Sequence, residues 1–398
     1  MDIRRKNLFA LLMAFSWVVS TAGVALAGLG GGTETEQNRF SWHPSITTSM
    51  AADDNTQLEK SDSKSDLGFF ITPRIELAYQ GHWFDLGADL GADIRRYIDR
   101  SSPSDEFYRL TGWAELGVLP GFTMRFSNAY VPSAVDLASP AEHSANLVQT
   151  NRTVADLRFW SEVPGDGEIT LSALGTRFFS ESFAAQVGGA VFDDGFRSDF
   201  WEGSLAGEYQ SPLVERLSGF VRTQVRFRSF DDKSIDDFGD LAVVVGIRTD
   251  WFENVEFEMS GGYGLVGFYL GDRNHGFVGD LNLRYHVRNG TVLRLSFQNQ
   301  NVFDIIGNAF TEATGRIGIE HRFGERTAAE VAVFGSRLDN QSWDSGVNFY
   351  AGVDANIRRQ LTRRTQLEIA YRYWHNAGEY SSDDFSQNQL MLTLSYRR

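Results

Sequence analysis

The amino-acid sequence predicts an all-β fold: a transmembrane, up-and-down antiparallel β-barrel of about 18 strands with both termini in the periplasm. Apolar and polar residues alternate almost without a break from Gln37 to Arg398. Very short connections between these stretches alternate with long, polar ones. The chain begins with a basic segment that is followed by an apolar one. Because successive side chains of a strand point to opposite faces, a stretch such as Leu281–Arg288 has one apolar and one charged face.

The first 27 residues predict a secretory signal peptide. Basic residues in Met1–Lys6 precede an apolar run that ends in Ala25-Leu-Ala27, which has the small residues of a cleavage site. We therefore expect removal of residues 1–27, a short periplasmic segment at 28–36 and a barrel at 37–398. A retained membrane anchor is the alternative for the apolar run. No other segment approaches the roughly 20 consecutive apolar residues that a membrane helix needs.

Composition narrows the class of protein. The formal net charge of −15 argues against nucleic acid as a partner. The chain has no cysteine, which excludes a disulfide framework and thiolate metal ligands. The 39 glycines, the 8 prolines and the lack of a helical period favour one continuous sheet over several soluble domains.

Each alternating stretch is expected to form one strand, in chain order. The expected strands span residues 37–52, 69–80, 82–99, 105–119, 122–131, 147–163, 168–179, 196–210, 217–230, 238–252, 255–270, 277–287, 291–305, 311–323, 327–338, 346–361, 365–375 and 385–396. Tight turns such as Gln80-Gly81 alternate with polar loops such as Asp53–Asp66. Bacterial barrels keep short turns in the periplasm and long loops outside. Without the weakly patterned first strand the number of strands would be odd, and the chain would start outside the cell and not in the periplasm.

Aromatic residues cluster beside the expected short turns. The residues expected at the membrane interface are Trp83, Trp160, Trp251, Tyr285, Phe323 and Tyr396, with Tyr79, Phe122, Tyr209 and Phe252 nearby in the same pattern. Rings with a polar edge lie well at headgroup level, so the pattern favours an interfacial girdle. The alternative is the aromatic core of a soluble all-β protein.

The charged face of the strands is expected to line an aqueous channel, as in barrels of 16–18 strands. The candidate lumen-lining residues are Asp85, Asp89, Asp93, Arg222, Arg226, Arg228, Glu256, Glu258, Arg284, Arg288, Arg294, Arg316, Glu320, Glu368 and Arg372. Rows of arginine on neighbouring strands would orient an acidic or hydroxyl-rich solute during passage. The alternative is that these side chains form ion pairs that brace the wall.

Two external loops, residues 132–146 and 180–195, are long enough to reach over or into the pore. We expect one of them either to fold into the pore as a constriction or to cap it from outside. The pairs Asp231-Asp232 and Asp236-Asp237 lack the ligand spacing of a calcium loop, so no metal or cofactor is expected. The histidines have no recognisable spacing with a serine, so an enzyme is not expected.

The last strand has Leu390, Leu392, Leu394 and Tyr396 on one face, followed by Arg397-Arg398. It resembles the C-terminal signal recognised by the outer-membrane barrel assembly machinery. That signal usually ends on an aromatic residue, whereas here the aromatic is third from the end. The assembly machinery and outer-membrane lipid are therefore the expected general partners.

The opening of the barrel region resembles a family of outer-membrane β-barrel porins associated with exopolysaccharide synthesis and export systems. The resemblance rests on Ser45–Asn55, where a strand runs into an Asp-Asp-Asn loop, and on Ile71–Tyr79, which begins near a proline. It implies an eighteen-stranded conduit that exports a polysaccharide together with a periplasmic export protein.

Two functions therefore stay open: a polysaccharide export channel, and a general or substrate-selective diffusion porin for small solutes. A barrel enzyme or an adhesin is a third class, but no catalytic constellation is apparent and the loops are short for an adhesin. A plugged receptor is disfavoured, because only residues 28–36 precede the first strand.

Overall fold

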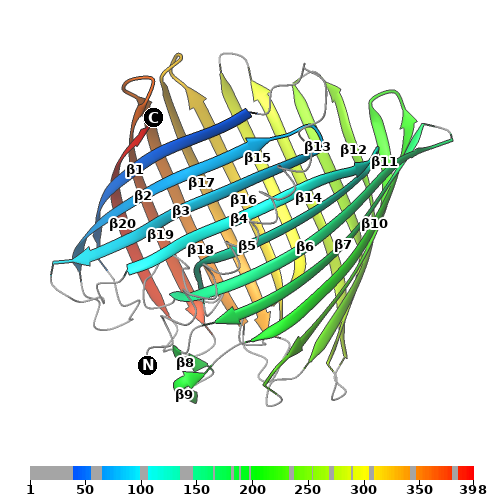
Figure 1. The fold of residues 1–398 in the computed structure, drawn as a ribbon, viewed down its shortest axis with the longest axis horizontal. Helices are drawn as coiled ribbons and strands as arrows, with labels where there is room; N and C mark the ends of the chain where they lie inside the picture. The colour runs from blue at the N-terminus through cyan, green and yellow to red at the C-terminus, as the bar shows by residue number, and fades with distance from the viewer. Residues whose placement is uncertain are drawn as a thin grey trace, which may run out of the picture. The chain divides into compact units, whose positions relative to one another are not determined.

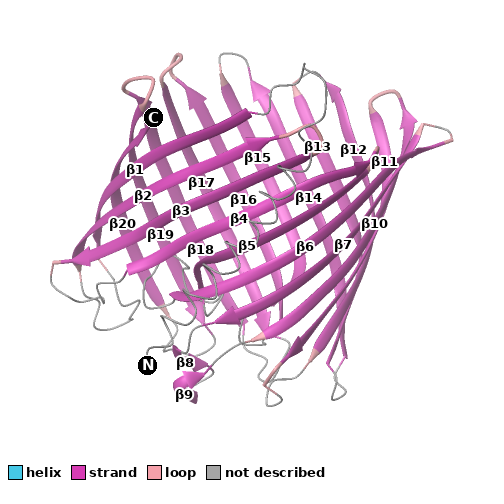
Figure 2. Ribbon diagram, viewed as in Figure 1, coloured by secondary structure: helices cyan, strands magenta, loops and turns pink. Residues whose placement is uncertain are grey.

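The computed structural model describes residues 39–54, 65–98, 106–134, 147–164, 166–180, 183–187, 190–196, 199–232, 237–252, 254–268, 273–287, 290–303, 309–340, 347–378 and 384–398. All regular elements among them are β-strands (Figure 2). Among the same residues there is no helix with the length and hydrophobicity needed to cross a membrane. The expected signal peptide and periplasmic segment lie outside the described residues, so both stay predictions.

The described residues form twenty strands, which follow one another in chain order (Figure 1). They are β1 (Arg39–Asp53), β2 (Asp66–Gln80), β3 (Phe84–Tyr97), β4 (Glu106–Leu119), β5 (Phe122–Ala134), β6 (Leu147–Val163), β7 (Gly167–Ser180), β8 (Phe183–Val187), β9 (Ala190–Phe196), β10 (Phe200–Val214), β11 (Leu217–Phe230), β12 (Phe238–Phe252), β13 (Val255–Phe268), β14 (Arg273–Val287), β15 (Thr291–Phe303), β16 (Ala309–Arg322), β17 (Thr327–Asn340), β18 (Val347–Gln360), β19 (Thr365–Gly378) and β20 (Phe385–Arg397).

Eighteen of these strands form one closed antiparallel sheet. Each strand pairs with the next in the chain, β7 pairs with β10, and β1 pairs with both β2 and β20. The last two pairings close the ring, so no strand of this sheet is an edge strand over its whole length. The predicted fold class, an antiparallel barrel of 18 strands, is confirmed.

Most predicted strands are found within a few residues of their expected ends, including the weakly patterned first strand. Two details differ. The strand expected to begin at Phe277 begins at Arg273, since Arg273–Gly276 carries no apolar alternation that could mark it. The region expected as a loop at 180–195 contains β8 and β9, which pair only with each other.

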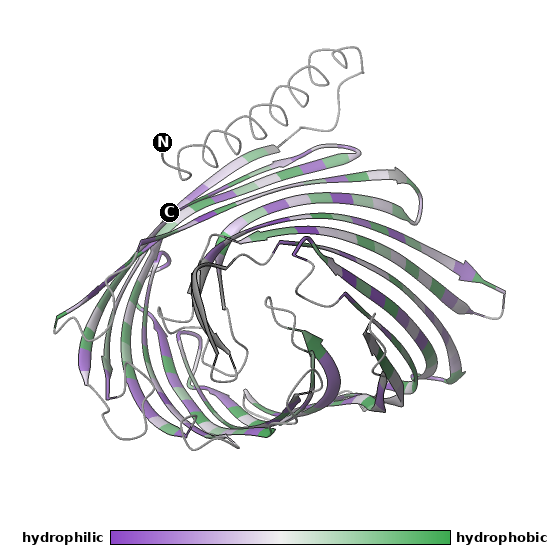
Figure 3. Cartoon of the chain, turned by 90° about the horizontal axis from the view of Figure 1, so that it is seen from below, coloured by the Kyte–Doolittle hydropathy of each residue, from purple (hydrophilic) through white to green (hydrophobic). Residues whose placement is uncertain are grey.

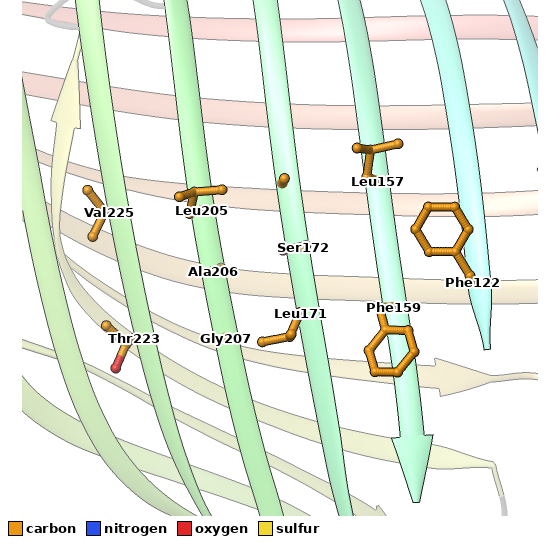
Figure 4. Close-up of a pocket in the computed structure, with 11 residues that line it drawn as sticks. Phe122, Leu157, Phe159, Leu171, Ser172, Leu205, Ala206, Gly207, Thr223 and Val225 are labelled. Atoms are coloured by element: carbon orange, nitrogen blue, oxygen red, sulfur yellow. The ribbon is translucent and has the colours of Figure 1, made fainter.

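One face of the sheet is apolar along its whole circuit. Large apolar side chains on this face are exposed, for example Leu205 (61%), Val245 (59%) and Ile317 (65%). The alternation of hydropathy along each strand is visible in Figure 3. A shallow cavity of about 440 Å³ on this face is lined by apolar side chains of β5, β6, β7, β10 and β11 (Figure 4). A surface this apolar is the kind that lipid, and not water, covers.

Short connections join the strands at one end of the sheet and longer ones at the other, and both β1 and β20 have their terminal ends at the short-turn end. Gly121 shows what such a turn requires. Its φ of 77° is left-handed, and a Cβ there would lie 2.1 Å from the carbonyl oxygen of Trp160. Only glycine fits both constraints.

Candidate functional site

The polar face of the sheet is the inner face of the barrel. On the inside of a curved sheet, side chains from strands that are not direct neighbours converge. Arg316 of β16 pairs with Asp354 of β18 at 2.9 Å, and Arg222 of β11 lies 3.7 Å from Glu258 of β13. Both contacts skip one strand of the sheet.

A ring of four alternating charges crosses β10 to β13. Arg222 Nε donates to Glu208 Oε2 at 2.7 Å, and Arg248 Nε donates to Glu258 Oε2 at 2.7 Å. The crossed distances, Arg222 to Glu258 and Arg248 to Glu208, are both 3.7 Å. Each carboxylate therefore serves two arginines.

A second chain of charges runs across β15 to β19. Arg294 donates to Glu320 at 2.6 Å, and Arg372 and Arg316 share Asp354 at 3.0 and 2.9 Å. Glu330 lies 3.7 Å from Arg294 and 3.9 Å from Arg316. Since one guanidinium has five N–H donors, these contacts do not saturate the arginines.

A cavity of about 740 Å³ lies between the two networks, toward the short-turn end. Its charged lining residues are Arg216, Arg248, Arg284, Arg294, Arg316, Glu256 and Glu258. Five arginines and two glutamates line the cavity itself, and the carboxylates that pair with these arginines from outside the lining are Glu208, Glu320, Glu330 and Asp354. Several of these side chains keep much of their surface in contact with solvent, such as Arg284 (45%) and Arg316 (40%). The cavity therefore presents hydrated guanidinium groups whose unused N–H donors can bind an anion.

The remaining predicted residues lie on the same inner face. Asp89 pairs with Arg74, and Asp93 accepts from Arg109 Nε at 2.5 Å and from Thr72 Oγ1 at 3.0 Å. Asp85 accepts from the Gly81 N–H at 3.3 Å.

Two glutamates complete the predicted set. Glu256 lies 3.7 Å from Arg284 and 3.2 Å from His286. Glu368 lies opposite Arg358 in the register of β18 and β19. Arg288 lies outside the described residues.

Arg226 and Arg228 of β11 differ from the others because they are embedded among aromatic rings. Arg226 makes a bidentate pair with Asp240 at 2.7 and 3.0 Å. Arg228 pairs with Glu202 at 2.6 Å, and its Cζ lies 4.1 Å from the centroid of the Phe200 ring. The Arg228 side chain is only 9% exposed, so this pair is part of a core and not of an open water-filled surface.

The end of β15 leaves the wall of the barrel. The ladder between β14 and β15 stops at Gly279 opposite Asn299. In contrast, β13 and β14 stay paired as far as Arg273, and β15 and β16 stay paired as far as Phe303. The long-loop ends of β15 and β16 therefore separate together from β14.

These ends cross the inner faces of the preceding strands. The Phe303 ring stacks on Phe238 of β12 with a centroid distance of 4.1 Å and an interplanar angle of 17°. Arg226 of β11 donates to the Asn301 carbonyl at 3.0 Å, and Asn299 Nδ2 donates to the Phe277 carbonyl at 2.6 Å. Since β11 lies four strands away from β15 around the sheet, the end of β15 occupies space inside the barrel.

Two apolar clusters hold this end in place, one on each face of β15. Phe303 packs against Phe178, Phe200, Phe230 and Phe238, here called the Phe303 cluster. On the other face, Val302 packs against Phe310, Leu338 and Tyr350. Together they narrow the barrel at its long-loop end.

The sequence-based expectation of a constriction or an external cap concerned two loops, and it stays a prediction for both. Most of residues 132–146 lie outside the described residues, and the described part of 180–195 belongs to the paired strands β8 and β9. The inward element among the described residues is the end of β15. One signal was present: the apolar row Leu293, Leu295 and Phe297 continues as Asn299 and Asn301, which lipid would not accommodate.

The aromatic residues expected at the membrane interface differ in where the structure places them. Tyr285, Phe323 and Tyr396 lie in the exposed apolar row near the short turns, with exposures of 40%, 62% and 40%. Trp83 lies in the β2–β3 turn and is 46% exposed. Trp160 lies two residues from Arg158 on β6 and therefore shares its face, whereas the exposed Phe159 lies on the other face. The side chain of Trp251 lies outside the described set.

The acidic pairs considered as a cation site are engaged in other contacts. Asp231 pairs with Arg177 at 2.5 Å, and Asp237 accepts from the Phe230 N–H at 2.8 Å. Among the described residues, no group of three or more histidine, aspartate or glutamate side chains has the arrangement of a metal site.

Comparison with known proteins gives similarity of fold. No family model matches the chain, and no curated protein matches it. Among solved structures, the outer membrane protein OpdK from Pseudomonas aeruginosa is 11% identical, with 90% of this chain and 99% of that chain covered and a TM-score of 0.54.

Two further structures from the same organism are similar. OccK9 (OpdG) is 15% identical, with coverages of 90% and 98% and a TM-score of 0.55. A crystal structure of OpdK with vanillate is 11% identical, with coverages of 90% and 99% and a TM-score of 0.53. The chain thus has the same closed, 18-stranded antiparallel barrel fold as these proteins.

Proposed function

We propose that this protein is a diffusion channel of a Gram-negative outer membrane, selective for small acidic solutes. The observation that carries the proposal is the arginine-rich cavity of about 740 Å³ on the inner face, below a narrowed long-loop end. Guanidinium groups bind carboxylates through paired, charge-assisted hydrogen bonds. A solute carboxylate would exchange with Glu330 or Asp354 as it moves along Arg294, Arg316 and Arg372.

The exposed apolar outer face supports a membrane location, with the short turns in the periplasm. The similar OpdK structure that contains vanillate, an aromatic carboxylate, supports a small acidic solute. Signal cleavage, recognition of β20 by the assembly machinery, and the absence of catalysis remain predictions within this proposal.

Polysaccharide export, which the resemblance implies, has less support. A polymer needs an open path over the full length of the barrel, whereas the β15 end occupies the interior at the long-loop side. Deletion of the gene separates the two functions in cells. Slower uptake of a small carboxylate with surface polymer intact supports the porin, and loss of surface polymer supports export together with a periplasmic partner.

The direct test is selectivity in planar bilayers. The wild-type channel is expected to prefer chloride over potassium in a salt gradient, and added benzoate is expected to block the current transiently. The variant Arg294→Gln/Arg316→Gln is expected to lose most of this preference. The control Arg337→Gln removes a positive charge paired with Asp339 outside the cavity and is expected to keep it. Equal ion preference in wild type and double variant would refute the proposed role of the cavity.

A further inference from the structure

The short-turn end of the barrel carries an unusual concentration of positive charge. Three neighbouring segments, the β16–β17 turn, the β18–β19 turn and the end of β20, contain exposed arginines. These residues, called the basic rim, are Arg322, Arg326, Arg359, Arg363, Arg364, Arg397 and Arg398. The whole chain has a net charge of −15, and the short turns β2–β3, β4–β5 and β6–β7 contain no arginine or lysine.

Backbone hydrogen bonds tie the basic rim into one row. The Gln360 N–H donates to the Arg326 carbonyl at 2.8 Å, and the Arg397 N–H donates to the Arg364 carbonyl at 2.9 Å. The Arg364 N–H also donates to Thr362 Oγ1 at 3.1 Å. The charged side chains therefore start from fixed backbone positions on adjacent turns.

Most of the basic rim lacks an acidic partner. Arg322 lies 3.6 Å from Glu320, and Arg397 pairs with Glu76 at 2.7 Å. The other members, Arg326, Arg359, Arg363, Arg364 and Arg398, form no ion pair with any carboxylate of the described residues. Exposed guanidinium groups at close spacing repel one another unless an anion lies between them.

The basic rim lies directly beside the apolar outer face. Phe323 (62% exposed), Leu361 (44%) and Tyr396 (40%) belong to the same three segments. In a barrel, exposed aromatic residues at this position mark the level of the lipid headgroups. Arg359 shares the outer face of β18 with the exposed Ile357, so Arg359 and the turn residues Arg363 and Arg364 lie at the level of the headgroup phosphates. Arg322 and Arg397 instead follow the inner face, where they contact Glu320 and Glu76. Guanidinium groups bind phosphate bidentately.

We propose that the basic rim binds the phosphate groups of anionic phospholipids, such as phosphatidylglycerol, in the membrane leaflet at the short-turn end. The proposal rests on the membrane location in the proposed function, but not on the solute carried. A surface that follows the apolar belt suits lipids better than a folded protein, which would have to approach from the aqueous side.

Native mass spectrometry of the purified full-length protein tests this proposal. The protein is released from micelles that contain phosphatidylglycerol or phosphatidylcholine with the same acyl chains. We expect bound phosphatidylglycerol to exceed phosphatidylcholine at least about tenfold at low salt, because each basic residue near a membrane surface adds to the attraction. The preference is expected to fall strongly in 0.5 M salt, and glycerol phosphate without acyl chains is expected not to compete.

Matched variants locate the site. Arg359→Gln/Arg363→Gln/Arg364→Gln is expected to lose the lipid preference and to keep conductance and ion selectivity. The control Arg96→Gln/Arg158→Gln/Arg337→Gln removes the same charge elsewhere and is expected to keep the preference. Heat-modifiable migration in detergent gels shows whether each variant is folded.

Four outcomes overturn the inference: equal binding of both lipids by the wild type, retention of the preference in the rim variant, its loss in the control variant, or competition by glycerol phosphate. Capture of an acidic periplasmic protein by the rim without any lipid preference also overturns it. If the protein is soluble in buffer without detergent and inserts into neither lipid, the result refutes the membrane location on which the proposed function depends.

Discussion

Replacement of Phe303 by alanine is expected to open the long-loop end of the barrel. Phe303 anchors the β15 end to the inner wall through its stack on Phe238 at 4.1 Å. Its ring also lies 4.9 Å from Cζ of Arg226 and 5.8 Å from Cζ of Arg228. The substitution removes all three ring contacts and leaves the β14–β15 ladder below Asn299 intact.

The magnitude follows from these contacts. Full burial of a phenylalanine side chain contributes about 1.5–3 kcal/mol, and an aromatic pair adds roughly 0.5–1.5 kcal/mol. Phe303 is only partly buried, so we expect a loss of about 2 kcal/mol in the docking of the β15 end. This corresponds to a change of roughly 30-fold in the ratio of docked to released states.

Single-channel recording measures the consequence. Release of the β15 end is expected to raise the mean conductance and to add fluctuations between two levels. Phe297→Ala is the matched control, because this phenylalanine of the same strand is 43% exposed in the outer apolar row. An unchanged conductance in a folded Phe303→Ala protein would show that this end does not limit the pore.

Three other predictions concern the wall itself. Val245→Arg is expected to destabilise the barrel in lipid vesicles by about 2–4 kcal/mol, measured by urea titration, because Val245 is 59% exposed midway along β12. Ala242→Arg, on the inner face of the same strand, is the comparison. Equal destabilisation by the two substitutions would contradict the lipid-facing assignment of Val245. Gly262→Val is expected to block folding, since a Cβ there would lie 1.9 Å from a backbone carbonyl oxygen of β12. A variant that still migrates as a folded barrel in unheated detergent gels would contradict this prediction. Arg228→Ala is expected to lower the free energy of unfolding by roughly 3 kcal/mol in the same urea assay, because it leaves the Glu202 carboxylate, 15% exposed, without its closest cation. Arg228→Leu/Glu202→Leu is expected to recover much of that stability. A larger loss of stability in the double variant would show that the unpaired carboxylate is not the cause.

The sequence by itself determined the fold class. Alternation with period two is a local property of an extended strand, so residues such as Leu281, Leu283 and Tyr285 reveal both the strand and its apolar face before any partner is known. The contrast between short turns and long loops gave the order of the strands and the shared end of the two termini. The candidate inner-face residues followed from the same alternation.

Only the tertiary structure decided which charges meet and where the barrel narrows. The pairing of Arg316 with Asp354 depends on the register of three strands, and alternation along one strand carries no information about register. The end of β15 keeps its extended backbone and its pairing with β16 on both sides of Asn299, so its local pattern does not change where it leaves the wall. That departure depends on contacts of the β15 end with β11 and β12. Contacts between strands that are distant in the sequence exist only in the folded barrel.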